Sequence, residues 1–269
     1  MMQGIRPPAV AGTFYSDDPV ELKKQLSDYL KLDNGATHQL KGLKALIVPH
    51  AGYIYSAPIA ASAYQLLTDK TAFNNVVLIG PSHVVPFKGI AGSSATYFST
   101  PLGKIPLDTI KLKELEQLGF TKQYDPAHAL EHSLEVQLPF LQTTLKNFTL
   151  IPLVVGEASI EQVFEVLGFL WGDSRTLIVI STDLSHYQDY ETAQYLDNAT
   201  NQAILGLAPS NISYENACGR TPLNALLRLA KLKELKVKLL DLKNSGDTSG
   251  NKERVVGYGS WALVDPNAE

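Results

Sequence analysis

One stretch, Leu46-Ile47-Val48-Pro49-His50-Ala51-Gly52-Tyr53-Ile54-Tyr55-Ser56, determines the fold class that the sequence predicts. A β-branched, apolar run ends in a proline and a histidine, and a glycine then turns the chain into a small-residue segment, 56–64, that is typical of a helix. The same pattern, an apolar run followed by a turn with a histidine, recurs at 76–83 and 177–186. Ligands bind at the carboxyl edge of strands in open α/β sheets. The three histidines that follow these runs are therefore expected to share one site.

Strand and helix patterns alternate around this stretch from residue 44 to residue 264 without a linker. We expect one α/β domain over residues 1–269, with a mixed, mainly parallel central sheet and helices on both faces. Residues 1–20 contain adjacent prolines and should form an extended N-terminal arm. Strand-like residues at 90–92 and 95–98 suggest a hairpin.

Composition narrows the class of protein. The chain has 269 residues, of which 45% are hydrophobic and 19% charged, a balance typical of a globular protein. A net charge of −4 gives no support for binding to nucleic acid. The single cysteine, Cys218, excludes an internal disulfide. No apolar run has the length of a membrane span and no signal-peptide core is present, so we expect a cytoplasmic protein that does not bind a membrane.

The strand-end histidines suggest metal chemistry. If the strand ends converge, His50, His83 and the loop carboxylate Asp247 could meet, and two imidazoles with one carboxylate form the ligand set of non-haem Fe(II). With Zn the same set would act as a Lewis acid. His186 would be available for proton transfer, with Asp183 three residues earlier to orient its ring.

Each of these residues also has a structural interpretation. A histidine at a strand end is often a hydrogen-bonded structural group. Asp183 and His186 could cap the helix that follows them, and Asp247 could be an ordinary turn residue.

Two other segments add candidates. If 133–138 is helical, His132 and Glu135 share a face, and Pro139 should end or kink the helix. These side chains, with Glu131, would be solvated if the helix is peripheral. Cys218 precedes a predicted helix whose N-terminus would lower the pKa of its thiol. A Cys–His nucleophilic pair is thus an alternative, although nothing nearby supplies an oxyanion hole.

Several motifs occur in the order in which they are found in the Memo family, and the sequence resembles that family from the N-terminal arm to Val264. The motifs are Arg6-Pro7-Pro8-Ala9-Val10-Ala11-Gly12-Thr13-Phe14-Tyr15, Pro49-His50-Ala51-Gly52-Tyr53-Ile54-Tyr55-Ser56, Gly80-Pro81-Ser82-His83, Glu131-His132-Ser133-Leu134-Glu135, Ser181-Thr182-Asp183-Leu184-Ser185-His186 and Cys218-Gly219.

The resemblance implies a fold similar to class III extradiol ring-cleaving dioxygenases, with a non-haem iron site. His50 and His83 match the family's metal-ligand histidines, and its third ligand falls in the loop that contains Asp247. Asp183 and His186 match pocket residues, with His186 in the place of a general base. His132, Tyr55 and Cys218 are further pocket candidates.

In prokaryotes the family is known as protein B of the AmmeMemoRadiSam system, which implies association with AMMECR-type and radical SAM proteins. We expect a mononuclear non-haem metal protein with dioxygenase-like or redox activity on a small molecule. Fe(II) is the expected metal, with Cu or Zn as alternatives. A second interpretation is that the protein is a non-catalytic binding module whose pocket holds an anionic ligand or a partner peptide. Metal-assisted hydrolysis is a third interpretation.

Overall fold

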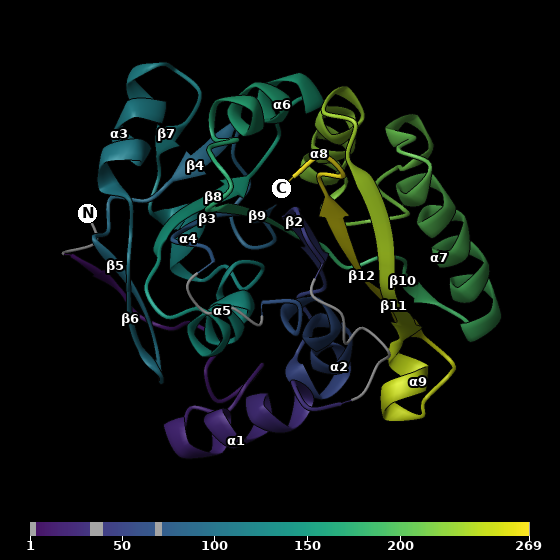
Figure 1. Ribbon diagram of the computed structural model, residues 1–269. Helices are drawn as coiled ribbons and strands as arrows, with labels where there is room; N and C mark the ends of the chain where they lie inside the picture. The colour runs from purple at the N-terminus through teal and green to yellow at the C-terminus, as the bar shows by residue number, and fades with distance from the viewer. Residues whose placement is uncertain (1–3, 33–39, 68–71, 269) are drawn as a thin grey trace.

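The computed structural model describes residues 4–32, 40–67 and 72–268 (Figure 1). Over this part of the chain a nine-stranded sheet has the order β10-β12-β2-β9-β3-β8-β4-β7, and β11 pairs with β12. Its strands are β2 (Leu43–Val48), β3 (Asn75–Pro81), β4 (Ile90–Gly92), β7 (Lys122–Gln123), β8 (Thr149–Val155), β9 (Thr176–Ser181), β10 (His186–Gln188), β11 (Lys236–Asn244) and β12 (Val255–Val264).

The centre of this sheet is parallel. The pairs β2–β9, β3–β9 and β3–β8 are all parallel, whereas β12 joins β2, β11 and β10 in antiparallel pairs. Every residue of β2 and β9 is buried, which explains why both read as continuous apolar runs in the sequence. The carboxyl ends of β2, β9 and β3 therefore lie side by side at one edge.

Helices cover both faces of the sheet, as the sequence predicted. In Figure 1, α2 and α5 lie on one side of it, and α6 and α8 lie on the other. The helical segments are α1 (Pro19–Tyr29), α2 (Tyr53–Tyr64), α3 (Thr109–Gln117), α4 (Pro126–Ala129), η1 (Glu135–Gln137), α5 (Leu138–Thr144), α6 (Ile160–Phe169), α7 (Tyr190–Leu205), η2 (Pro209–Asn211), α8 (Arg220–Leu232) and α9 (Ser245–Ser249). Together these layers form one α/β domain with a mixed, largely parallel sheet.

Local sequence explains how several helices begin. The Asp18 side chain accepts the backbone N–H groups of Val20 and Glu21 at the start of α1, and Ser159 forms a capping box with Gln162 at the start of α6. Pro139 does not end a helix. It lies in the first turn of α5, where a missing N–H has no cost.

A second, three-stranded sheet differs from the expected hairpin. It consists of β1 (Ile5–Arg6), β5 (Tyr97–Thr100) and β6 (Gly103–Pro106) in the order β1-β5-β6. The strand at 90–92 instead joins the large sheet, because it pairs with β8 and β7. The N-terminal arm occupies the edge of β5 that a hairpin with β4 would have required. Across the described residues, no helix is long and apolar enough to cross a membrane.

Candidate metal centre

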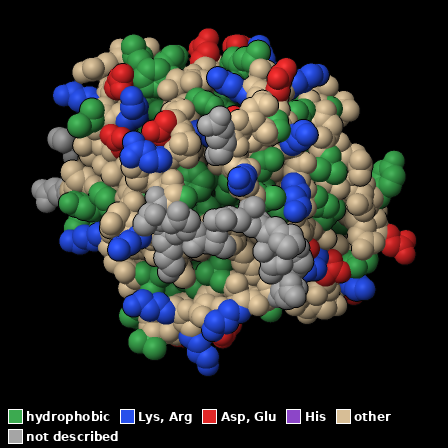
Figure 2. Space-filling model, viewed as in Figure 1, with side chains coloured by type: hydrophobic (Ala, Val, Ile, Leu, Met, Phe, Trp, Pro, Cys, Tyr) green, Lys and Arg blue, Asp and Glu red, His purple; other side chains and the backbone are tan. Residues whose placement is uncertain are grey.

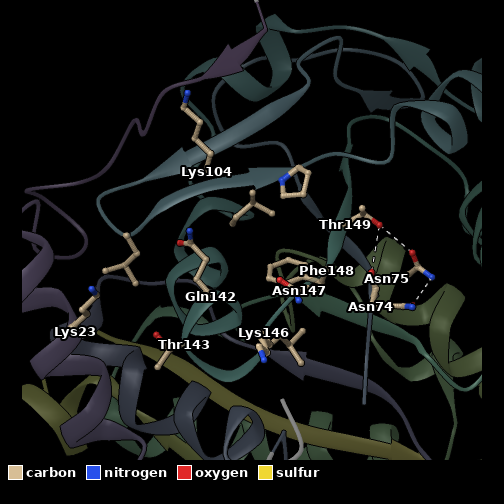
Figure 3. Close-up of a pocket in the computed structure, with 14 residues that line it drawn as sticks. Lys23, Asn74, Asn75, Lys104, Gln142, Thr143, Lys146, Asn147, Phe148 and Thr149 are labelled. Carbon is tan, nitrogen blue, oxygen red and sulfur yellow. Dashed lines mark hydrogen bonds between the residues drawn. The ribbon is translucent and has the colours of Figure 1, made fainter. Parts of the chain in front are cut away.

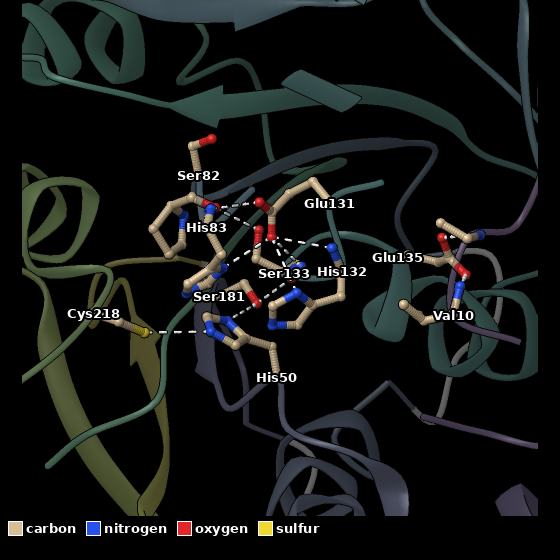
Figure 4. A network of polar contacts seen from close by, with 12 residues as sticks. Val10, His50, Ser82, His83, Glu131, His132, Ser133, Glu135, Ser181 and Cys218 are labelled. Carbon is tan, nitrogen blue, oxygen red and sulfur yellow. Dashed lines mark hydrogen bonds and ion pairs between the residues drawn. The ribbon is translucent and has the colours of Figure 1, made fainter. Parts of the chain in front are cut away.

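Three histidines meet at the carboxyl edge of the parallel strands. His50 follows β2, His83 follows β3, and His132 lies in the loop between α4 and η1. One ring nitrogen from each lies within 4.8 Å of the others (Figure 4). The ring centroids of His83 and His132 are 4.6 Å apart, and those of His50 and His83 are 5.1 Å apart. The convergence of His50 and His83 follows from the parallel pairing of their strands with β9.

Glu131 orients His83. Its Oε1 atom lies 2.9 Å from the ring Nδ1, and its Oε2 atom accepts the backbone N–H of His83 at 2.6 Å. Burial alone would raise the pKa of Glu131, but the hydrogen bonds from His83 lower it to about 2. An ionised carboxylate beside Nδ1 requires a proton on that nitrogen, which leaves the lone pair on Nε2. This is the arrangement of a carboxylate that orients a metal-binding imidazole.

His50 is held deep in the protein. It is 1% exposed, and its Nδ1 lies 3.0 Å from the Ser181 hydroxyl at the end of β9. Burial, followed by the charges of neighbouring histidines, holds the pKa of His50 well below its usual value. The ring is therefore neutral at ordinary pH, and neutral imidazole is the form that binds metal.

His132 completes the group. Its backbone N–H donates to Glu131 Oε1 at 3.0 Å, and its ring contacts Phe14 of the N-terminal arm at a centroid distance of 4.8 Å. Burial lowers its pKa, so this imidazole is also neutral near neutral pH. The sequence marked His132 as a pocket candidate and not as a ligand, because no strand precedes it. Its position is set by its loop, in which Glu131 contacts the His83 ring and accepts the backbone N–H of His132.

The N-terminal arm holds that loop in place. Arg6 is 1% exposed, donates from Nε to the His128 carbonyl at 2.9 Å and from Nη2 to the Glu131 carbonyl at 2.8 Å, and forms an ion pair with Glu135. Glu135 also accepts the Val10 N–H at 2.9 Å. The sequence predicted solvated side chains here only for a peripheral helix, and the structure instead buries Glu131 and Glu135 and leaves His132 half-buried. The arm supplies the cation and the donors that make a buried carboxylate stable here.

Asp247 is not part of the histidine group. Its Oδ2 accepts the backbone N–H of Asn244 at 2.9 Å in a capping box at the start of α9, and its Oδ1 accepts the Tyr190 hydroxyl at 2.6 Å. Both carboxylate oxygens thus serve to fix a short helix. The structure places His132, and not this carboxylate, beside His50 and His83.

Asp183 and His186 both lie near the centre but do not pair as expected. Asp183 Oδ1 accepts the backbone N–H of His50 at 2.7 Å, and burial raises the pKa of this carboxyl to about 7. His186 Nδ1 lies 2.7 Å from the Leu184 carbonyl, which orients the ring in place of Asp183. His186 is close enough for its charge to lower the pKa of His50.

Cys218 lies beside His50 at the edge of the group. Its Sγ atom is 3.3 Å from His50 Nε2. The sequence predicted a lowered thiol pKa, but burial, followed by the charge of Asp183, raises it to about 12. The prediction is wrong because desolvation of the half-buried thiol and the charge of Asp183 outweigh the effect of the helix N-terminus. Tyr55, another pocket candidate, is 36% exposed in the first turn of α2.

Two cavities differ in their relation to this centre. One of about 440 Å³ adjoins it and is lined in part by Ser82 and Cys218. The other, of about 830 Å³, lies at the opposite ends of the strands, where Asn75 and Thr149 begin β3 and β8 (Figure 3). On the face seen in Figure 2, basic and acidic side chains are both present and no coloured residue is a histidine.

The fold and the three imidazoles define an α/β protein with a candidate metal centre at the carboxyl edge of its sheet. The sequence profile of the family described as Memo-like protein matches residues 6–262, so the chain belongs to the Memo family. A MEMO1 family protein from Sulfolobus acidocaldarius is 34% identical over 97% of this chain and 100% of its own length. One from Aquifex aeolicus is 35% identical over 94% and 97%.

The fold is also similar to that of a solved structure from outside these relatives. The crystal structure of the uncharacterized protein JW3007 from Escherichia coli K12 superposes with a TM-score of 0.52. The match covers 81% of this chain and 99% of that chain, at 13% sequence identity. It supports the α/β architecture alone.

Proposed function

We propose that this Memo-family protein is a mononuclear non-haem metal protein that carries out dioxygenase-like or other redox chemistry on a small molecule. The observation that carries the proposal is the convergence of three ring nitrogens within 4.8 Å of one another. Two of the imidazoles are held through Nδ1 by side chains: Glu131 holds His83, and Ser181 holds His50, whose Nε2 contacts the Cys218 thiol.

The residues present fit a transition metal. Three imidazoles suit Fe, Cu or Zn, and three protein ligands leave positions open for substrate. Fe(II) is our proposal. The three residues include no carboxylate, so the ligand set does not itself select iron, and the choice of Fe(II) rests on the resemblance to the dioxygenases. When bound, the metal would supply Lewis-acid or redox chemistry at this edge of the sheet.

The protein's own contribution would be proton transfer by His186. The Leu184 carbonyl beside Nδ1 requires a proton there, so Nε2 carries the lone pair and can accept a proton. Burial lowers the pKa of this ring, so that near neutral pH it is in the neutral form that can accept a proton. Replacement by Gln should leave the metal content unchanged and lower turnover by roughly 10²–10⁴.

Metal analysis tests the centre directly. Protein purified anaerobically without a chelating tag should contain about one metal per chain, a figure that follows from one three-ligand site. His50→Ala, His83→Ala and His132→Ala should each lower metal occupancy at least tenfold, since loss of an outer partner already costs about that much. Reconstitution with Fe(II), Zn or Cu, followed by oxygen uptake, would identify the active metal.

Asp247→Asn is the matched control, because it removes a carboxylate that caps α9 while leaving the three histidines in place. It should bind metal as the wild type does. Unchanged occupancy in all three histidine variants would exclude the centre.

A further inference from the structure

The cavity beside the histidines has a charged wall. It has a volume of about 440 Å³, lies between the loop after β3 and the start of α8, and includes Cys218, whose Sγ atom is 3.3 Å from His50 Nε2. Its volume falls in the range typical of small-molecule sites. A molecule that fills it would contact the edge of the candidate metal centre.

Arg220 lines this cavity without a counter-ion. Its Nε atom is buried and has no hydrogen-bond partner, and no ion pair found among the described residues includes it. The guanidinium carbon lies 5.7 Å from the Tyr214 ring centroid, a weaker contact than an ion pair. A buried donor without a partner is costly, and the planar guanidinium fork matches carboxylate and phosphate.

The start of α8 adds positive potential at the same place. This helix has 13 residues, and its N-cap, Gly219, supplies no capping side chain. The positive end of the helix dipole therefore favours an anion near Arg220. Two further charged residues, Lys88 and Glu157, line the cavity, and both are exposed. Glu157, the acidic residue of this lining, therefore lies at the side that is open to solvent.

We propose that this cavity binds a small molecule through a carboxylate or phosphate group, with the anion on Arg220 and the rest of the molecule directed toward Cys218 and the histidines. Apolar side chains that also line the cavity, among them Phe87 and Pro222, would contact an apolar body. This inference rests on the proposed function, since it names the substrate class of the same centre. Arg220 would determine specificity without binding the metal.

Three probes of similar shape test the proposal. Benzoate and phenyl phosphate carry an anion on an aromatic body, and benzamide is the neutral counterpart of benzoate. Titration of the purified full chain, followed by ligand-observed NMR, should show binding of one or both anions. Benzamide should bind about tenfold more weakly or worse, because it cannot form the charge-assisted hydrogen bond. The anion that binds more tightly assigns the group.

Substitutions then assign the binding to Arg220. Arg220→Met should weaken anion binding about tenfold or more, and Arg220→Lys should restore part of it because the charge returns without the fork. Lys104→Met is the matched control, since it removes one positive charge at the remote cavity of Figure 3. Should Arg220→Met fail to fold, the comparison of Arg220→Lys with wild type still applies.

The outcomes separate this proposal from the metal proposal. The proposal would be overturned if neither anion binds the wild type at about 10 mM, a concentration at which a specific site would be occupied. It would also be overturned if Arg220→Met binds the anions as tightly as the wild type does. Metal content is measured on the same samples. If the metal content is normal but anion binding does not depend on Arg220, this inference alone is wrong. If anion binding depends on Arg220 but the protein binds no metal, the proposed function is wrong and the anion site remains.

Discussion

At the scale of single residues, two buried carboxyl groups show how environment decides the role of a side chain. Glu131 receives hydrogen bonds from the ring and backbone of His83, and its pKa falls to about 2. Asp197 on α7 is 3% exposed and accepts the Ser185 N–H at 3.0 Å, and burial raises its pKa to about 6. Hydrogen bonds from His83 thus favour the anion of Glu131, whereas burial favours the neutral form of Asp197.

Asp197 should make the protein less stable as the pH rises. Because its pKa is higher in the folded state than its ordinary value of 3.8, the protonated group adds stability that is complete below that value and is lost as the pH rises through about 6. Asp197→Asn should remove this contribution, so that its free energy of unfolding exceeds that of the wild type by roughly 1–3 kcal/mol more at pH 7.5 than at pH 4.5. Urea unfolding of both proteins between pH 4.5 and 7.5 measures it.

The exposed Glu253→Gln is the control for that series and should leave the pH dependence as it is. A difference in stability between Asp197→Asn and wild type that stays constant across the window would contradict the prediction.

At the scale of elements, the N-terminal arm and the loop that carries His132 act as one unit. Arg6 joins them through two backbone carbonyls and the Glu135 ion pair, all of them buried. Arg6→Met would leave Glu135 without its cation, and breaking a buried pair in this way costs about 3–5 kcal/mol. The same change should lower metal occupancy, because His132 would lose its support. Urea unfolding and metal analysis measure the two effects.

Arg175→Met is a suitable comparison. It also removes an ion pair, but Arg175 and its partner Asp173 are 62% and 56% exposed, and surface pairs contribute about 0–1 kcal/mol. If the two variants are equally stable, the arm does not hold the loop.

The elements also show what sequence could and could not predict. His50 and His83 were identified because a strand period precedes each one, and parallel pairing brings such positions together. His132 follows no strand and is placed by contacts with Arg6, Glu131 and Phe14, which are distant in the chain or depend on a loop conformation.

Asp247, the third ligand that the sequence suggested, caps a helix in the structure. Asn244 and Asp247 have the spacing of a capping box, a local signal that was present in the sequence but was outweighed by the resemblance. The strands at 90–92 and 97–100 look like hairpin partners, but β4 pairs with β7 and β8, whereas β5 pairs with β1 and β6. Periodicity thus predicted the layers, whereas contacts between distant segments decided the edges and the third ligand.

At the scale of the whole molecule, the candidate centre joins three distant parts of the chain. His50 and His83 end two strands of the core, and His132 belongs to a loop that the N-terminal arm holds. A metal that binds all three should therefore stabilise the native fold as a whole, because the unfolded chain cannot bring these residues together.

Thermal unfolding should show this stabilisation. At a metal concentration about 100 times the dissociation constant, binding adds about 2.7 kcal/mol, which for a domain of this size raises the midpoint by roughly 5–10 °C. Chelation should reverse the rise. His132→Ala should lose most of it, because only the two strand-end ligands remain, whereas Asp247→Asn should keep it. A full metal-dependent rise in His132→Ala would show that the loop contributes no ligand, and the centre would then reduce to the two strand ends with a partner that is not His132.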